Sequence, residues 1–419
     1  MTKNRVLVLA ETIDLDSSSA GKARNAFIQS LVSSAFFVKV FHYSHKKVQI
    51  NGVVPILISE NKKDVFYVLS RAQRILQRLS GYNFSKLLEN KFGFSFTFTN
   101  DVNSIVSVLR KEEPADYDLI ITLSKGASYR THAALLKLPQ WHGKWLAYVH
   151  DPYPFHWYPK PYNWQEAGAK HKEFFFNEVA NKARWLGYPS QKLAEWMGKF
   201  NRRFMEKAVI LPHQSSNLLQ IKKVPSFFEF EKFTVVHAGN LLKQRNPFPL
   251  IEAWQLFLNR STDAKRKSQL LLLGPASYHE SGLSERCCQI ESIYRSDGYV
   301  NYAEVRAIER DASVNIVLEA KAKISPFLPA KFPGLIEANR LILHLGPHKS
   351  EVRRLLGGDY KYATEADNVE EIAKHFSLLF KLWKNSPKEL ELNRKDLEDY
   401  FLTEKLAKEI EYLCVQQNL

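Results

Sequence analysis

A short loop with one glycine and two basic residues follows an apolar run in the second half of the chain. The run Phe233–Ala238 (FTVVHA) is typical of a buried strand, and Gly239, Lys243 and Arg245 come after it. Glycine lets the backbone approach a ligand closely, while an arginine fork and a mobile lysine both suit phosphate oxygens. Simple solvation of a loop is the alternative for the two cations. The strand–glycine–loop–helix setting favours an anion-binding loop, in which we include Asn240.

Two further segments of the second half could contribute to the same site. Pro329, Ala330 and Lys331 are expected to form the first turn of a helix that runs to about Asn339, because proline is favoured at a helix start and free amides there attract anions. An ordinary helix start with a solvent-exposed lysine is the alternative. Gly274 and Pro275, after an apolar run, would shape a ligand pocket through their backbone alone.

The first half offers a histidine and an aspartate at the end of an apolar run. His150 is the last residue of the run WLAYVH, and Asp151 follows it directly. Ligands of open α/β sheets bind outside the carboxyl ends of the strands. Asp151 could act as a general base, whereas a histidine that only caps the strand is the alternative for His150. Gly21 and Arg24, near a serine-rich segment, are further candidates beside a plain flexible turn.

The elements that must position these residues alternate between strands and helices. The first half has apolar strand candidates at Arg5–Ala10, Phe37–Phe41, Val53–Ile58, Asp118–Leu123, Trp145–His150 and Val209–His213, and the second half at Phe233–Ala238, Leu270–Gly274, Val314–Leu318 and Leu341–Leu345. Helical patterns such as Pro249–Leu258 and Val369–Leu382 separate or follow them. Parallel neighbours need a crossover, normally a helix. The sequence therefore predicts an α/β protein with two doubly wound sheets joined near residues 214–230.

Composition narrows the classes of partner. The chain has 419 residues with 59 Lys and Arg against 44 Asp and Glu, a net charge of +15, which favours anionic partners. No run approaches the length of a membrane span, and the N-terminus lacks a signal-peptide pattern, so we expect a cytoplasmic protein. Motifs of nucleic-acid-binding folds are not evident, and no G-x-G-x-x-G turn follows the first strand. The three cysteines have neither disulfide-framework nor zinc spacing.

Several motifs, in order, resemble the GT-B glycosyltransferases, particularly the large retaining family with bacterial mannosyl- and rhamnosyltransferases. They are FTVVHAGNLLKQRNPFPLIEAW at 233–254, LLLLGPAS at 270–277, RDASVNIVLEA at 310–320 and SPFLPAKFPGLIEANRLILHLGPHKSEVRRLLGG at 325–358, with YVHDPYPFHWYP at 148–159 and YPSQKLAEWM at 188–197 upstream. The resemblance implies two Rossmann-like domains facing across a cleft. Residues 1–225 would bind the acceptor, 226–395 the nucleotide-sugar donor, and the helix in 396–419 would return to the first domain.

The resemblance also implies an activity. The chain would be a metal-independent, hexosyltransferase-like enzyme without a cofactor, which transfers a sugar from a nucleotide-diphosphate donor to a glycan or lipid-linked acceptor in bacterial cell-surface synthesis, with retention. Arg245, Lys331, His150 and Asp151 would be catalytic. Many family members carry two glutamates eight positions apart, where this chain has Pro326 and Gly334. Glu337 is a possible substitute, and a catalytically inactive nucleotide-sugar-binding scaffold is the alternative function.

A basic amphipathic segment suggests a membrane partner. Lys62–Phe92 mixes basic residues with apolar ones at near-helical spacing, as in helices that lie on anionic membranes. A helix that packs its apolar side on the sheet is the alternative. We therefore expect the protein to associate with the inner face of the membrane and to have no nucleic-acid partner.

Overall fold

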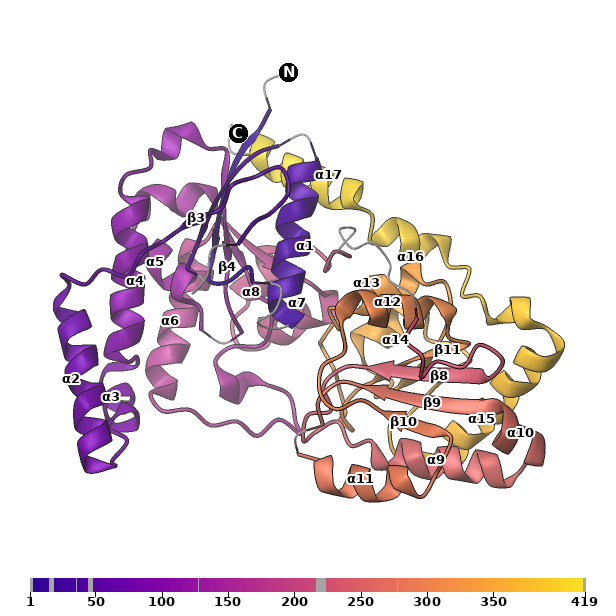
Figure 1. Cartoon of the computed structure of the whole chain (residues 1–419). Helices are drawn as coiled ribbons and strands as arrows, with labels where there is room; N and C mark the ends of the chain where they lie inside the picture. Colours follow the sequence, from indigo (N-terminus) through magenta and orange to yellow (C-terminus); the bar gives the residue numbers. More distant parts are fainter. Residues whose placement is uncertain are drawn as a thin grey trace. The chain divides into compact units, whose positions relative to one another are not determined.

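The chain divides into two compact units. The computed structural model describes residues 3–14, 19–34, 36–43, 48–126, 128–215, 224–276 and 278–416. Unit 1 comprises Met1–Tyr158, Asn163–Ser216 and Phe401–Leu419, and unit 2 comprises Pro159–Tyr162 and Asn217–Tyr400. In each unit helices cover both faces of one parallel sheet, as the alternating pattern predicts (Figure 1).

Unit 1 is built on a seven-stranded sheet in the order β3-β2-β1-β4-β5-β6-β7, in which every pair is parallel. The strands are β1 (Arg5–Ala10), β2 (Phe37–His42), β3 (Ile56–Leu57), β4 (Leu119–Leu123), β5 (Trp145–Tyr148), β6 (Trp185–Tyr188) and β7 (Ala208–Ile210). Val6 pairs with Val38 of β2 on one side and with Leu119 of β4 on the other. The strand order therefore reverses between β1 and β4, where such sheets open a crevice for ligands.

The helices of unit 1 cover two apolar cores, one on each face of the sheet. They are α1 (Ser19–Ser33), α2 (Val65–Ser80), α3 (Ser85–Phe92), α4 (Phe96–Leu109), α5 (Arg130–Leu136), α6 (Ala169–Lys182), α7 (Gln191–Gly198), α8 (Arg203–Glu206) and α17 (Thr403–Val415), with 3-10 turns η1 (Pro114–Asp116), η2 (Pro139–Lys144) and η3 (Phe155–Trp157). The segment expected to be one helical stretch, Lys62–Phe92, is two helices, because Gly81 ends α2 in a left-handed conformation at φ 67°.

Unit 2 has a six-stranded parallel sheet in the order β10-β9-β8-β11-β12-β13. The strands are β8 (Phe233–Ala238), β9 (Ser268–Leu273), β10 (Ile293–Arg295), β11 (Val314–Leu318), β12 (Leu341–Leu345) and β13 (Ala363–Thr364). β8, β9, β11 and β12 are buried along their whole length, which explains their continuous apolar runs. Here the order reverses between β8 and β11.

The helices of unit 2 follow the same alternation. They are α9 (Phe248–Asn259), α10 (Thr262–Lys267), α11 (Glu280–Cys288), α12 (Tyr302–Asp311), α13 (Phe332–Glu337), α14 (Glu351–Leu356), α15 (Val369–Asn385), η4 (Pro387–Leu390) and α16 (Lys395–Tyr400). The helices expected at Pro249–Leu258 and Val369–Leu382 are present. The stretch expected to be one helix near the end of the chain is two, α16 in unit 2 and α17 in unit 1.

Helix α17 returns to unit 1 and completes one of its cores. Leu406, Ile410 and Leu413 are buried in the same cluster as Val6 of β1 and Ile28 of α1. The side chains of Ser30 and Thr403 also lie within hydrogen-bond distance, at 3.4 Å. Unit 1 is therefore discontinuous in sequence, with most of unit 2 inserted before its last helix.

Candidate functional site

The loops that follow β8 and β9, at the carboxyl end of the unit 2 sheet, are held together by backbone hydrogen bonds. Gly239 N donates to Leu273 O at 2.8 Å, and Leu241 N donates to Pro275 O at 2.9 Å. Gly274 has a φ of +128°, and a Cβ atom there would lie 2.6 Å from Gly239 O. Glycine is therefore required at position 274, because the loop after β8 passes directly against it. The backbone of Gly274 and Pro275 positions the Gly239 loop.

The basic residues of the Gly239 loop differ in their surroundings. Arg245 is half-buried, and its Nη1 lies 3.5 Å from Asn240 O. Arg245 Nε and Asn240 Oδ1 are buried and have no hydrogen-bond partner among the described residues. Lys243 is exposed, with Nζ 4.9 Å from the centre of the Tyr278 ring. A buried donor without a partner is costly, so Arg245 is the better placed of the two cations to receive a ligand oxygen.

Lys331 bridges the two strands at which the order of the unit 2 sheet reverses. Its buried Nζ donates to Ala238 O at the end of β8, at 2.8 Å, and to Ile316 O of β11, at 3.0 Å. Burial lowers the pKa of Lys331 to about 8, an effect that Glu309 opposes and Arg245 increases. Lys331 thus places a buried positive charge beneath the Gly239 loop, with its hydrogen bonds directed to the protein backbone.

The helix expected to start at Pro329 starts later and is shorter. α13 begins at Phe332, after a turn closed by Phe332 N and Pro329 O at 2.8 Å, and it ends at Glu337. Pro333 occupies the first turn, where a missing N–H is tolerated, and Asn339 adopts a left-handed φ of 50° that prevents continuation. The helix predicted over 329–339 is therefore present, but its predicted bounds are wrong, and Lys331 is the N-cap residue of α13.

A buried histidine lies next to these cations. Both ring nitrogens of His237 are buried, next to the backbone of Ile316. Its pKa lies well below the usual value, first because of burial and then because of Lys331 and Arg245. His237 is therefore neutral near pH 7. A Cβ atom on Gly239 would lie 3.6 Å from its Nε2, so the ring packs directly under that glycine.

Arg245 also lines a pocket in unit 2 that is partly open to solvent. The other lining residues are Tyr162, Glu319, Ala320, Ala322, Ile324, Ser325, Phe327 and Pro329. Glu319 directly follows β11 and is buried, and its two carboxylate oxygens accept from Ser325 Oγ at 2.6 Å and pair with His344 Nε2 at 2.7 Å. These contacts fix a carboxylate in the wall of the pocket that Arg245 also lines.

Glu319 is a candidate site residue that the sequence reasoning did not select. Its only local signal is its position directly after an apolar strand. The residues that hold it, Ser325 and His344, are 6 and 25 positions away in sequence. The sequence reasoning instead proposed Glu337 as the substitute carboxylate.

Glu337 does not line the pocket. Its Oε2 pairs with Arg306 Nη2 of α12 at 3.0 Å, and Arg306 Nη1 also pairs with buried Glu309 at 2.9 Å. A Cβ atom on Gly334 would lie 2.4 Å from Arg306 Nη1. The guanidinium of Arg306 therefore fills the space that a side chain at position 334 would need.

In unit 1, Arg24 bridges the two strands at which the sheet order reverses. Arg24 is completely buried, and it donates from Nε to Thr12 O after β1, at 2.6 Å, and from Nη1 to Ser124 O after β4, at 2.7 Å. Nη2 has no hydrogen-bond partner among the described residues. Burial lowers the pKa of Arg24 to about 10, against the effect of Glu11 and Asp151. Gly21 lies in the first turn of α1, while Ser17 and Ser18 fall outside the described residues.

His150 and Asp151 lie at the same edge of unit 1. The sequence predicts a strand that runs to His150, but β5 ends at Tyr148. His150 and Asp151 therefore follow the strand by two and three positions. The Tyr148 and His150 ring centres are 4.6 Å apart, and His150 Nε2 is buried without a partner among the described residues. Burial, Arg24 and His213 hold the pKa of His150 well below its usual value, so the ring is neutral. Asp151 is close enough to raise the pKa of Arg24.

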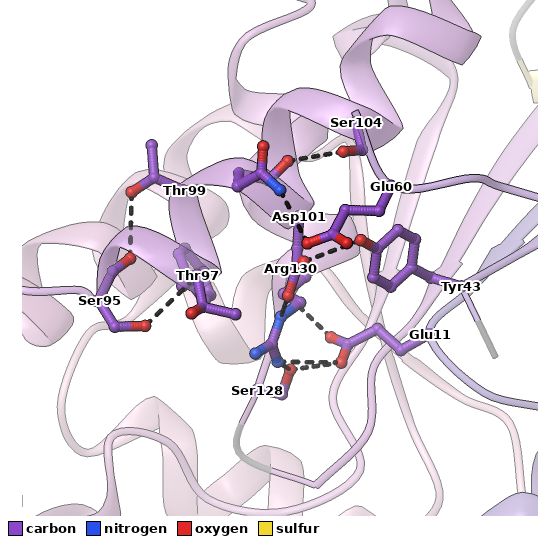
Figure 2. A network of polar contacts seen from close by, with 12 residues as sticks. Glu11, Tyr43, Glu60, Ser95, Thr97, Thr99, Asp101, Ser104, Ser128 and Arg130 are labelled. Carbon is purple, nitrogen blue, oxygen red and sulfur yellow. Dashed lines mark hydrogen bonds and ion pairs between the residues drawn. The ribbon is translucent and has the colours of Figure 1, made fainter. Parts of the chain in front are cut away.

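A polar network beside Arg24 fixes the acidic group that follows β1 (Figure 2). Glu11 accepts from Arg130 N at 2.7 Å and from the hydroxyl of Ser128. Arg130 Nε in turn donates to Asp101 at 2.7 Å, and Asp101 accepts from Tyr43 at 2.8 Å. Burial raises the pKa of Glu11, although Arg130 opposes the shift. The network holds α4 and α5 in place at the edge of the sheet.

The structure thus gathers most of the predicted site residues at two sheet edges. Arg24, His150 and Asp151 meet in unit 1, and Gly239, Asn240, Arg245, Gly274, Pro275 and Lys331 meet in unit 2. Lys243 is peripheral, and Glu337 lies elsewhere on α13. Among the described residues no cluster of three or more His, Cys, Asp or Glu could hold a metal ion.

Comparison with known proteins finds similar structures but no similar sequences. No family model matches the chain, and no curated protein is significantly similar in sequence. The chain is similar to the trehalose-6-phosphate phosphatase N-terminal domain of Candida albicans, with a TM-score of 0.66, 10% identity and coverage of 100% of this chain and 98% of that one. It is also similar to HepE of Anabaena in complex with UDP and glucose, with a TM-score of 0.65, 11% identity and coverage of 99% and 100%.

A third similar structure is a glycosyltransferase of Rickettsia africae, with a TM-score of 0.62, 13% identity and coverage of 99% of this chain and 98% of that one. These likenesses extend over both units and include both parallel sheets. At such identities they report the fold. The expected architecture is confirmed: the chain has the GT-B fold, with two Rossmann-like domains.

Proposed function

We propose that the protein is a hexosyltransferase-like enzyme that takes a sugar from a nucleotide-diphosphate donor. The observation that carries the proposal is the cluster under Gly239, where Arg245 presents a buried Nε without a partner next to neutral His237 and charged Lys331. Two structures with this fold are described with UDP and glucose and with UDP-2-fluoro glucose. A nucleoside diphosphate supplies the anionic oxygens that this cluster lacks.

In this proposal, unit 2 stabilises the leaving diphosphate. Charge develops on phosphate oxygens as the bond to the sugar breaks, and preorganised donors in a site of low dielectric stabilise it. Arg245 would donate directly, while Lys331 would act through its charge because its hydrogen bonds already go to Ala238 O and Ile316 O. Protein cations thus take the role of a metal, which predicts that a chelator leaves turnover unchanged.

We further propose that Glu319 orients the donor sugar. Each of its carboxylate oxygens has one partner in the protein and can accept a second hydrogen bond from a sugar hydroxyl. Replacing Glu319 by glutamine keeps the shape and removes the charge. We expect a higher KM for the donor sugar with little change in the affinity for the free nucleotide.

In unit 1 we propose that the edge formed by Arg24, His150 and Asp151 receives the acceptor. A neutral histidine with a free ring nitrogen can hydrogen-bond an acceptor hydroxyl, and Asp151 could accept its proton. With retention of configuration the leaving diphosphate would accept that proton instead. A glycan or lipid-linked acceptor of a bacterial cell-surface pathway completes this proposal.

An inactive nucleotide-sugar-binding protein is the second candidate. Position 334 is a glycine, and the guanidinium of Arg306 occupies the space where a carboxylate side chain would lie. This arrangement replaces negative charge by positive charge next to α13. An inactive protein would bind the donor and release no nucleotide.

Thermal shift with UDP-, GDP- and dTDP-sugars, followed by a nucleotide-release assay, tests the proposal. A ligand that binds only the folded protein raises its melting temperature, so one nucleotide should stabilise the wild type and stabilise the Arg245→Ala variant much less. Arg260→Ala, an exposed arginine of the same unit, is the matched control. Binding without release supports the inactive alternative, and no stabilisation by any nucleotide contradicts both candidates.

A further inference from the structure

Helix α2 presents its apolar side chains to solvent. Among the residues of α2, all of which the structure describes, only Ser70 is buried, whereas Val68 is 62% exposed and Leu79 is 81% exposed. The large apolar side chains exposed along α2 and α3 are Val65, Val68, Leu69, Ile75, Leu76, Leu79, Tyr82, Leu87 and Phe92. An ordinary surface helix turns these residues inward. The alternative that α2 packs its apolar side on the sheet is therefore wrong.

The exposed residues form one stripe because their spacing is helical. Val65, Val68, Ile75 and Leu79 fall at intervals of three, seven and four residues, on one side of α2. The other side of α2 contacts α4, and the ring centres of Phe66 and Phe96 are 6.1 Å apart there. α2 is thus held on α4 while its apolar stripe is left without a protein partner among the described residues.

Positive charge runs beside the apolar stripe. Arg71, Arg74 and Arg78 form a second stripe at intervals of three and four residues. The segment 62–92 contains seven Lys and Arg and two acidic residues, a net charge of +5. Both acidic residues face protein groups, because Asp64 caps α2 and accepts from Asn103 at 2.8 Å, and Glu89 pairs with Lys172 at 3.0 Å. The surface presented to a partner is therefore apolar and basic.

We propose that the face formed by α2 and α3 binds the surface of an anionic phospholipid bilayer. Basic amphipathic helices lie in the membrane interface with apolar residues among the acyl chains and cations at anionic headgroups. A second copy of the chain would bring two +5 surfaces together, which like-charge repulsion opposes. No helix among the described residues has the length and apolarity to cross a bilayer, so contact would be through this face. The inference goes beyond the proposed sugar transfer and does not depend on it.

Flotation of the full chain with vesicles tests the proposal. Vesicles of phosphatidylcholine mixed with an equal amount of phosphatidylglycerol should bind the protein, and vesicles of phosphatidylcholine alone should bind it on the order of tenfold more weakly. Replacing Leu76 and Leu79 by Asp should reduce binding to the anionic vesicles by about tenfold or more, because the strength of binding scales with the apolar area that is buried in the membrane. The matched control replaces Phe174 and Tyr299, which are 70% and 80% exposed elsewhere, by Asp.

A charge variant separates the electrostatic contribution to membrane binding from the apolar one. Arg78→Glu should weaken binding to the anionic vesicles by roughly tenfold, while Arg266→Glu, on exposed α10, should leave it unchanged. Equal binding to both vesicle types, or equal loss in the stripe and control variants, would overturn the proposal. So would a dimer in solution that the stripe variant dissociates, because a second copy would then cover the face. None of these outcomes alters the nucleotide-binding test, which needs no membrane.

Discussion

The two units place a buried cation at the same point of their sheets. Arg24 joins the carbonyls that follow β1 and β4, and Lys331 joins carbonyls of β8 and β11. In each sheet these are the strands between which the order reverses and the crossovers diverge. The diverging backbones leave carbonyl oxygens unpaired, and a long basic side chain satisfies two of them at once.

The charged neighbours of the two cations differ in number and kind. Glu11 and Asp151 both lie close enough to Arg24 to raise its pKa, whereas Lys331 has one acidic neighbour and one cationic neighbour, Arg245. Glu309 is the one acidic group that raises the pKa of Lys331. The unit 1 crevice therefore contains its own counter-charges, and the unit 2 crevice gains most from an added anion. This contrast favours a neutral acceptor in unit 1 and a diphosphate in unit 2.

The largest expected effect is loss of the unit 1 cation. Arg24→Met removes two hydrogen bonds and leaves Glu11 and Asp151 with less positive charge nearby. Breaking a buried charged arrangement in this way costs about 3–5 kcal/mol. Hydrogen exchange in urea, resolved for unit 1, measures the loss. Arg202→Met, at an exposed arginine, is the control, and an equally small effect of both variants would mean that the counter-charges around Arg24 are unimportant.

Lys331→Met should cost less, about 1–2 kcal/mol near pH 7, because the two lost hydrogen bonds are partly offset by removal of a buried charge next to Arg245. Unfolding of unit 2 in urea measures this difference. Lys395→Met, on exposed α16, is the control. A loss as large as that of Arg24→Met would contradict the difference in counter-charges between the two crevices.

The pH dependence sharpens the same comparison. The pKa of Lys331 is about 8 in the folded protein and 10.5 in the unfolded chain. Between these values the unfolded state binds more protons, so the free energy of unfolding rises with pH by about 1 kcal/mol per unit. The wild type should therefore gain stability over Lys331→Met from pH 8 to pH 10. Equal pH dependence of the two proteins would show that Lys331 remains charged throughout.

Arg245→Ala should weaken nucleoside diphosphate binding about tenfold or more, because a hydrogen bond from a charged donor is lost in a half-buried site. Titration calorimetry measures this directly. Unit 1 has its own counter-charges, so Arg24→Gln should change the affinity far less. If both variants weaken binding equally, the assignment of the anion to unit 2 is wrong.

The smallest effect should come from the exposed cation of the same loop. Lys243→Ala removes a contact with the Tyr278 ring and a solvated charge, and we expect a change in nucleotide affinity of about two- to threefold. The same titration at low and high salt isolates the contribution of the Lys243 charge, because the contribution of an exposed charge decreases with salt. A loss as large as that of Arg245→Ala would make Lys243 a direct ligand.

The sequence was informative where burial dictates composition. β1, β8, β9, β11 and β12 are buried on both faces, and the continuous apolar runs predicted them. β6 (WLGY), β10 and β13 were not predicted, because short strands with aromatic, charged or small residues resemble loop segments. The pattern of α2 left two alternatives open, a membrane-facing stripe and a stripe packed on the sheet, since spacing shows that an apolar stripe exists and does not show which way it faces.

The candidate site was predictable by residue type and less so by contact. Gly239 and Arg245 were selected because a glycine and a basic residue after a strand suit phosphate, and Lys331 because it was expected in the first turn of a helix. The carbonyl partners of Lys331, on β8 and β11, depend on strand order, which local sequence does not encode. Glu319 was missed for the same reason, as His344 reaches it from the neighbouring strand.

The discontinuity of unit 1 has a consequence for biosynthesis. Translation proceeds from residue 1 upward, so all of unit 2 leaves the ribosome before α17, which buries Leu406, Ile410 and Leu413 against the unit 1 core. Until then, the face of the first sheet that α1 and α17 share is only partly covered, and apolar side chains of β1 and α1 are open to chaperones and to aggregation. The half that is synthesised first is therefore the half that can finish folding last.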